Sequence, residues 1–173
     1  METKAQGRVG GVLAATVTAA VLMAAPALAH HSFAIFDGEV VRVFTGVVTR
    51  VNPDANHLQI FFAPMNEERK NVLRDADGKP IVWAVEMAGS AQAAQDGISV
   101  NTFAAGTIFS VGLHPLRTGE PAGSRARTGA MFRCPDKKPP APGKHCDSAE
   151  GHIAYGEGGL PTPTEAISFS ASQ

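Results

Sequence analysis

The stretch over residues 40–51 constrains the fold most, because it is too rich in β-branched residues to favour a helix. Its side chains divide into two alternating sets, as they do on the two faces of a strand. Gly46 interrupts the run and predicts a bulge or a sharp bend, the usual device for curling a long strand. We therefore expect a fold built around one long, bent strand.

The later segments repeat this strand pattern with one exception. Residues 57–62, 81–87, 107–116 and 124–133 are predicted strands, whereas residues 88–96, which end at Gly97, have the composition of a short helix. Three strands, a helix and two more strands are the order of an OB-fold barrel. The sequence thus predicts a mainly β fold, a small five-stranded OB-like barrel with one short helix. An open five-stranded sandwich is the competing architecture.

An export signal precedes this domain. A weakly positive start is followed by an uncharged run over residues 9–25, then by Pro26 and by Ala27-Leu28-Ala29, the small-x-small pattern that signal peptidase recognises. The run is short and rich in Ala, Gly and Thr, whereas a membrane-spanning helix needs about 20 strongly apolar residues. We expect cleavage after Ala29, with cleavage after Ala27 as the alternative, and a periplasmic or secreted protein.

Removing the signal peptide, residues 1–29, leaves 144 residues with 13 basic and 15 acidic side chains, the size of one domain. The slightly negative balance argues against a nucleic-acid binder. No second apolar run is long enough to span a membrane. We expect residues 30–133 to form the barrel domain and residues 134–173, rich in Pro and Gly, to form a partly disordered extension.

Both cysteines fall in the exported part, with eleven residues between them. In an oxidising compartment, Cys134 and Cys146 predict a disulfide that tethers the extension. Closing a loop of this length stabilises the fold by about 3 kcal/mol. A metal site that combines the two thiolates with His145 is the alternative, although its spacing matches no common zinc pattern.

The new amino terminus carries the most chemical content. Cleavage after Ala29 would give His30 a free α-amine beside its imidazole, and this pair chelates divalent ions such as Cu(II). Either His31 or His57 would complete the metal site. Further candidates for a third ligand are His114, Asp37, Met65 and Glu86. The alternative is that the two terminal histidines are ordinary exposed residues.

The chain has no Gly-rich phosphate loop, no Ser-centred nucleophile elbow and no paired carboxylates at catalytic spacing. We therefore expect a binding protein rather than an enzyme, and an oxidative copper enzyme built on the His pair is a third hypothesis. The stretch from Arg117 to Lys144 is locally basic. It favours the alternative function, an interaction module whose barrel face binds an envelope polymer or a partner protein. Trp83 is a predicted core residue, and Glu86 a predicted rim residue on the opposite face.

Several short motifs are spread over residues 29–132. They are the segment 29–37 directly after the signal peptide, Gly46-Val47-Val48, Asn52-Pro53, Trp83-Ala84-Val85-Glu86, Gly106 and Pro115-Leu116-Arg117. Together they resemble a family of small exported bacterial proteins, domain-of-unknown-function family 6152. The resemblance implies export and a compact β-rich fold but no activity. A His pair tied to the mature start also favours metal binding.

The sequence departs from the family pattern near its first turn. Arg50 and Asp54 stand where the family has an aromatic residue and a histidine. If that histidine is a ligand in the family, its role has passed to His57 here or has been lost.

Overall fold

The computed structural model describes residues 33–53, 56–126 and 129–165. The chain divides into two compact units after Ile35. The described part of the first unit is a single 3-10 turn, η1 (Phe33–Ile35). His30, His31 and the predicted export signal lie outside the described residues. The second unit begins at Phe36 and contains the barrel.

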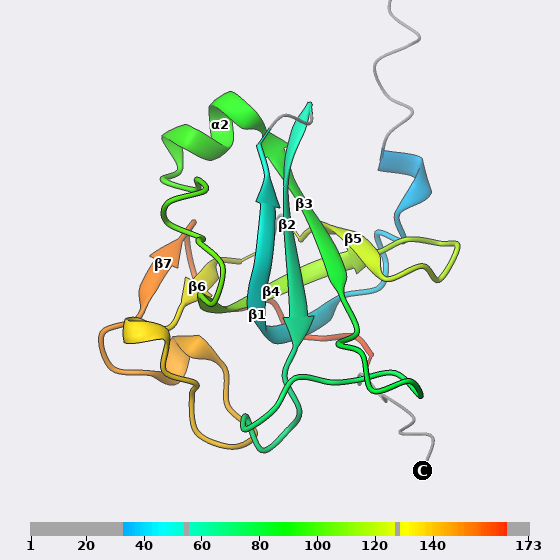
Figure 1. Cartoon of the computed structure of the whole chain (residues 1–173). Helices are drawn as coiled ribbons and strands as arrows, with labels where there is room; N and C mark the ends of the chain where they lie inside the picture. Colours follow the sequence, from blue (N-terminus) through cyan, green and yellow to red (C-terminus); the bar gives the residue numbers. More distant parts are fainter. Residues whose placement is uncertain (1–32, 54–55, 127–128, 166–173) are drawn as a thin grey trace, which may run out of the picture. The chain divides into compact units, whose positions relative to one another are not determined.

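Five strands close into a barrel (Figure 1), namely β1 (Arg42–Asn52), β2 (His57–Pro64), β3 (Trp83–Gly89), β4 (Ile108–Pro115) and β5 (Ala122–Arg125). They pair in the order β1-β2-β3-β5-β4, and β4 pairs again with β1. β3 and β5 run parallel, and the other barrel pairs are antiparallel. A short helix, α2 (Ser90–Gln95), connects β3 to β4. The predicted OB-like barrel is therefore confirmed.

β1 closes the barrel because its two halves pair with different strands. Residues 42–47 pair with β4, and residues 46–52 pair with β2. The sequence predicted an irregularity at Gly46. The register of β1 against β2 instead shifts further along the strand, between Val48 and Arg50. Gly46 instead admits a close neighbour. A Cβ there would lie 2.5 Å from Cδ2 of Phe62 and 2.9 Å from the carbonyl oxygen of Ala63.

The inward-facing side chains of the strands form the main core. Phe44 packs against Trp83 with ring centroids 4.7 Å apart, and Phe62 meets Phe109 edge to face at 5.2 Å. The same cluster includes Val48, Ile60, Val85, Val111, Leu113 and Met131. Trp83 is thus a core residue, as predicted.

The fifth predicted strand, residues 124–133, is two strands in the structure. β5 ends at Arg125, and β6 (Met131–Arg133) pairs with the other end of β4, at Phe109 and Ser110. Gly129, between them, has φ of +106°, which a strand does not accommodate. The chain therefore turns before it returns to β4.

The extension after β6 packs against the outside of the barrel. It contains η2 (Pro135–Lys137), η3 (Cys146–Ser148) and β7 (Ile153–Tyr155), which pairs with β6. Cys134 and Cys146 form the predicted disulfide, with Cα atoms 4.9 Å apart. A second apolar cluster joins the extension to the barrel; its buried members are Met65, Ile108, Ala130, Phe132, Cys134 and Cys146.

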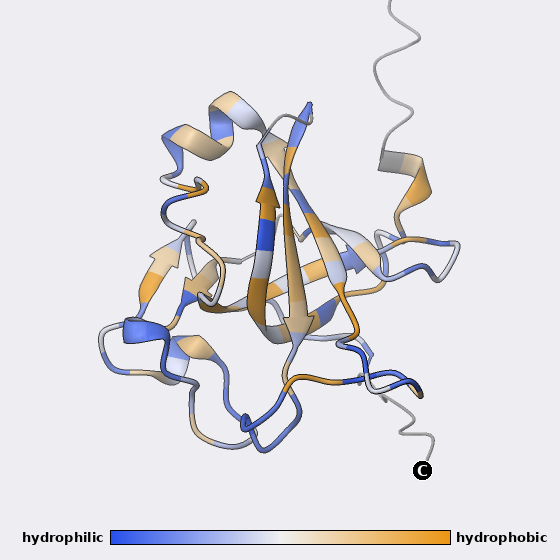
Figure 2. Ribbon diagram, in the orientation of Figure 1, coloured by the Kyte–Doolittle hydropathy of each residue, from blue (hydrophilic) through white to orange (hydrophobic). Residues whose placement is uncertain are grey.

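The last described residues cross β4 and reach the start of β1. Pro161 lies over Gly112, where a Cβ would come within 2.1 Å of Pro161 Cγ. Thr164 donates its backbone N–H to the carbonyl of Val41 (3.0 Å), and the Val41 N–H donates to Thr164 Oγ1 (2.8 Å). In Figure 2, hydrophobic and hydrophilic residues alternate along the barrel strands, while the loops around η2 and η3 are largely hydrophilic. None of the helices in the described ranges has the length and hydropathy to cross a membrane.

Candidate functional site

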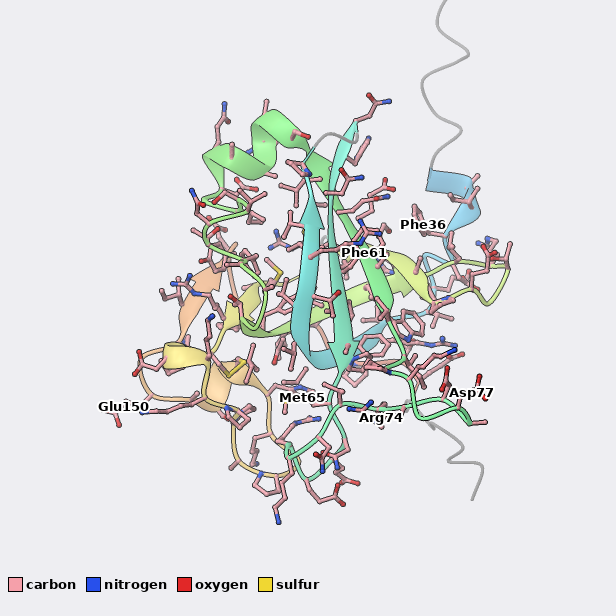
Figure 3. The ribbon with its side chains drawn as sticks, viewed as in Figure 1. Phe36, Phe61, Met65, Arg74, Asp77 and Glu150 are labelled. Atoms are coloured by element: carbon pink, nitrogen blue, oxygen red, sulfur yellow. A yellow bond between two sulfur atoms is a disulfide. The ribbon has the colours of Figure 1, made fainter. Side chains whose placement is uncertain are left out.

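A cleft of about 630 Å³ opens where the chain leaves β2. Its walls come from the start of β1, from the loop after β2 and from the extension. Met65, labelled in Figure 3 at the lower end of β2, lies in the wall. Strand β1 contributes Val43 and Thr45, the loop contributes Arg69 and the extension contributes His145.

A chain of hydrogen bonds beneath this cleft joins the extension to the barrel. Thr45 and Ser110 face each other across β1 and β4, and their hydroxyl oxygens lie 2.7 Å apart. Thr45 Oγ1 also lies 2.7 Å from Nδ1 of His145. The backbone N–H of Cys146 donates to Ser110 Oγ at 2.8 Å. Thr45 is 2% exposed and Ser110 is fully buried, so neither hydroxyl can substitute water for these partners.

Only one direction of proton donation satisfies the whole chain. The Cys146 N–H must donate to Ser110 Oγ. The Ser110 hydroxyl can then donate to Thr45 Oγ1, and the Thr45 hydroxyl can donate to His145 Nδ1. The reverse direction would leave the Ser110 proton without an acceptor among its contacts in the described residues. His145, which lines the cleft, is therefore the neutral tautomer with its proton on Nε2.

The electrostatic surroundings of His145 favour the same neutral form. Burial lowers the pKa of His145, and the nearby Arg69 cation lowers it further, while Asp147 acts in the opposite direction. A neutral Nε2–H is a hydrogen-bond donor. His145 can thus donate to an acceptor in the cleft without carrying a charge.

Arg69 cross-links the loop after β2 to the extension. Its Nε donates to the carbonyl of Lys144 (2.8 Å), and its Nη1 donates to the carbonyls of Asn66 (3.0 Å) and Met65 (3.4 Å). Burial lowers the pKa of Arg69, and Glu67 partly offsets this effect. No carboxylate oxygen in the described ranges lies within 4.0 Å of the guanidinium nitrogens. Arg69 is a half-buried cation whose hydrogen-bond acceptors among the described residues are all backbone carbonyls.

His57, the described member of the predicted metal set, lies at the start of β2 on the outer face. Its Nδ1 is 3.1 Å from the carbonyl of Met87 and 3.5 Å from Oε1 of Glu86. An Nδ1–H held by a carbonyl leaves Nε2 free as a ligand, the arrangement found in metal-binding histidines. Glu86 lies beside His57, in the part of β3 that pairs with both β2 and β5.

His114, near the end of β4, shows the same arrangement. Its Nδ1 lies 2.8 Å from the carbonyl of Val40, so Nε2 is again the uncommitted nitrogen. It also lies close to where the barrel unit begins, because Phe36 pairs with Leu116 and the Asp37 N–H donates to the carbonyl of Pro115 (2.8 Å). The structure therefore places this candidate ligand beside the entry of the chain into the barrel.

The metal candidates do not converge within the described ranges. Among those residues, no group of three or more His, Cys, Asp or Glu side chains is positioned to hold a metal ion. The alternative thiolate site is wrong, because Cys134 and Cys146 are bonded to each other. His30 and His31 lie outside the described residues, so their predicted role stays a prediction.

The sequence alone gave little weight to His145, which lies in a stretch rich in Pro and Gly. Two signals pointed to it. It directly precedes Cys146, whose disulfide holds the segment against the barrel. Thr45 and Ser110 are polar residues with apolar neighbours in β1 and β4. Arg125, part of the predicted basic surface, instead donates to the carbonyl of Tyr155 and so links β5 to β7.

Comparison with known proteins gives one family. The model of a family of unknown function, DUF6152, matches residues 19–125, which include β1 to β5 and end before the disulfide-linked extension. No curated protein and no solved structure matches the chain. The match covers more than half of the sequence and agrees with the motifs around Phe36, Trp83 and Pro115. The chain is a member of the DUF6152 family, whose function is unknown.

Proposed function

We propose that this protein is an exported metal-binding module that holds Cu(II), or a similar divalent ion, at the amino terminus of its mature chain. His30 would supply its α-amine and imidazole, and a second histidine would complete the site. The barrel would provide a rigid support for that second histidine. This is a binding role, and it requires the signal peptide to be removed after Ala29.

The single observation that carries this proposal furthest is the arrangement of His114. Its Nδ1 is held by the Val40 carbonyl at 2.8 Å, which leaves Nε2 available. It lies two residues from Leu116, the partner of Phe36. Six residues lead from His30 to Phe36, a length of at most about 20 Å when extended. His114 is thus a candidate ligand in addition to His31 and His57.

Calorimetric titration of the processed protein with Cu(II) tests the terminal chelate. A variant with one extra residue before His30 is the matched comparison, because it keeps every side chain but moves the α-amine away from His30. We expect the added residue to weaken Cu(II) binding by at least about tenfold, since one chelate ring is lost. Equal affinities for the two proteins would refute the terminal site.

Single substitutions then identify the second ligand. His114→Gln, His57→Gln and His31→Gln are compared in the same titration, and the ligand is the one whose loss weakens binding. His152→Gln is the control, because its Nδ1 also contacts a carbonyl, that of Ala149 (2.9 Å), while it precedes β7 in the extension. A loss at His152 equal to the other losses would indicate unspecific binding to surface histidines.

A second candidate function is binding of an envelope polymer or a partner protein on the outer face of the barrel. The observation that favours it is the Arg50 guanidinium, which stacks 3.4 Å from the centroid of the Phe61 ring. Phe61, labelled in Figure 3, lies half-buried on β2, two residues from Gln59. Cosedimentation with insoluble peptidoglycan would test this function. It predicts that Phe61→Ala weakens binding and that replacing His30 and His31 has no effect.

Catalysis by a bound copper ion is the remaining hypothesis. It would need an oxidisable substrate and an oxidant, and no described residue points to either. A screen of the copper-loaded protein with ascorbate and oxygen, with free copper as the control, tests it. Turnover above that of free copper would replace the binding role by an enzymatic one.

A further inference from the structure

We propose that the cleft beside His145 binds a small organic carboxylate with an apolar part, which accepts hydrogen bonds from Arg69 and His145. This site uses none of the histidines proposed as metal ligands. Its three parts are a cation, a neutral donor and an apolar wall, and they come from β1, the loop after β2 and the extension.

Arg69 supplies the positive charge. A half-buried guanidinium is stable when an anion offsets its loss of hydration. Here its hydrogen bonds within the described residues go to three backbone carbonyls, which satisfy part of its five N–H donors but carry no charge. Its backbone is left-handed, with φ of +57°, a conformation that is unfavourable for a non-glycine residue. The fold therefore holds this guanidinium at the cleft against a local conformational cost.

His145 supplies the second donor. The hydrogen-bond chain from Cys146 through Ser110 and Thr45 leaves the His145 proton on Nε2. These hydrogen bonds also fix the orientation of the His145 ring, because Thr45 and Ser110 are buried in β1 and β4. A donor that is already oriented loses little conformational freedom when it binds a ligand. An imidazole with its proton on Nε2 also disfavours a metal ion there.

The apolar wall selects for more than a bare anion. Val43, Met65, Leu73 and Pro163 line the cleft together with the two donors. A volume of about 630 Å³ falls within the usual range of small-molecule sites, roughly 300–1,000 Å³. A ligand that fills it needs an apolar body beside its carboxylate.

The acidic residues of the cleft limit the charge of that ligand. Glu165 is paired with Arg42 at 3.1 Å, and Glu67 and Glu68 are exposed. These carboxylates repel an anion with several charges, such as a phosphate ester. A ligand with a single negative charge meets less of this repulsion and can place its carboxylate at Arg69.

NMR titration of the ¹⁵N-labelled, metal-free processed protein tests the proposal, with phenylacetate and phenylacetamide as probes. The two have nearly the same shape, but only the first is an anion. We expect phenylacetate to give saturable shifts in amides of the cleft. Phenylacetamide should bind at least about tenfold more weakly, because charge-assisted hydrogen bonds are about twice as strong as neutral ones. Equal binding of the two probes, or no saturable shift with phenylacetate, would overturn the proposal.

Two variants with the same change of charge locate the site. Arg69→Gln should weaken phenylacetate binding by about tenfold or more, whereas Arg74→Gln should bind as the parent does. Arg74 follows Leu73 in the same loop but is exposed, donates to the carbonyl of Gly78 (2.7 Å) and does not line the cleft. Equal losses in both variants would mean an unspecific effect of net charge. If Arg69→Gln fails to fold, the comparison of the two probes on the parent protein decides the matter.

Discussion

Thr45 on β1 and Ser110 on β4 occupy facing positions of the same ladder, and their hydroxyl oxygens lie 2.7 Å apart on the outer side of the barrel. Each hydroxyl is connected to the disulfide-linked extension, Thr45 through His145 and Ser110 through the backbone of Cys146. The pair therefore joins the closure of the barrel to the position of the extension, and it supports the one histidine that lines the cleft.

Removing the Ser110 hydroxyl should destabilise the fold. Ser110→Ala leaves the Cys146 N–H without its acceptor in a buried site, and such a loss costs about 1–3 kcal/mol. The free energy of unfolding from urea denaturation measures it. Thr49→Val is the control, because Thr49 lies on β1 with an exposed hydroxyl and should change the stability by less than about 0.5 kcal/mol. Equal effects of the two substitutions would contradict the role of the buried pair.

Stability should depend on pH through His145. Its folded-state pKa is lowered from the ordinary value of 6.5, so on acidification the unfolded chain takes up this proton first. The free energy of unfolding therefore falls as the pH drops below about 6.5. Above that pH, His145 is neutral in both the folded and the unfolded state, so it causes no further change in stability. Urea denaturation at pH 5.5 and 7.5 measures the difference. In His145→Gln the difference should be smaller; an unchanged difference would assign it to other groups.

A side chain at position 112 should displace the end of the extension. In Gly112→Ala the new Cβ would lie 2.1 Å from Pro161 Cγ, and relieving such an overlap costs about 1–3 kcal/mol. Thermal unfolding measures the loss, and limited proteolysis should cut the extension faster. Gly38→Ala is the matched control, since a Cβ there has no neighbour within 4 Å. Similar melting temperatures for the two variants would show that Pro161 does not rest on β4 in solution.

Removing the disulfide should loosen the extension. The double variant Cys134→Ala, Cys146→Ala frees a loop whose closure contributes about 3 kcal/mol. It should also weaken the contact between His145 and Thr45, because Cys146 positions its neighbour. Urea denaturation gives the first effect, and the tautomer-sensitive ¹⁵N shifts of the His145 ring give the second. A ring that keeps its shifts would show that the hydrogen-bond chain holds His145 without the disulfide.

The mature amino terminus can be read directly. The intact mass of the protein purified from an exporting host should correspond to a chain that begins at His30, because Ala27-Leu28-Ala29 ends the signal peptide. A mass that places Leu28 first would leave His30 without a free α-amine. That result would remove the terminal chelate but would not affect the cleft beside His145.

The sequence by itself determined the class of the fold and the order of the barrel strands and of the helix between β3 and β4. Alternation of apolar residues is a local property, so the strands, the helix before Gly97 and the core position of Trp83 could be predicted without the structure. The disulfide followed from two cysteines in a chain that the sequence predicts to be exported. The boundaries near Gly129 could not be predicted in this way, because the division into β5 and β6 depends on where each segment meets β4.

Only the tertiary structure decided which polar groups meet. Thr45 and Ser110 are 65 residues apart, and Thr45 and His145 are 100 residues apart. Their contacts depend on the register of β1 against β4 and on the disulfide that holds the extension. Periodicity reports which face of a strand a residue occupies, whereas register and closure set its neighbours across strands. For this reason His145 looked like a residue of a loose tail in the sequence and is a fixed donor at a cleft in the structure.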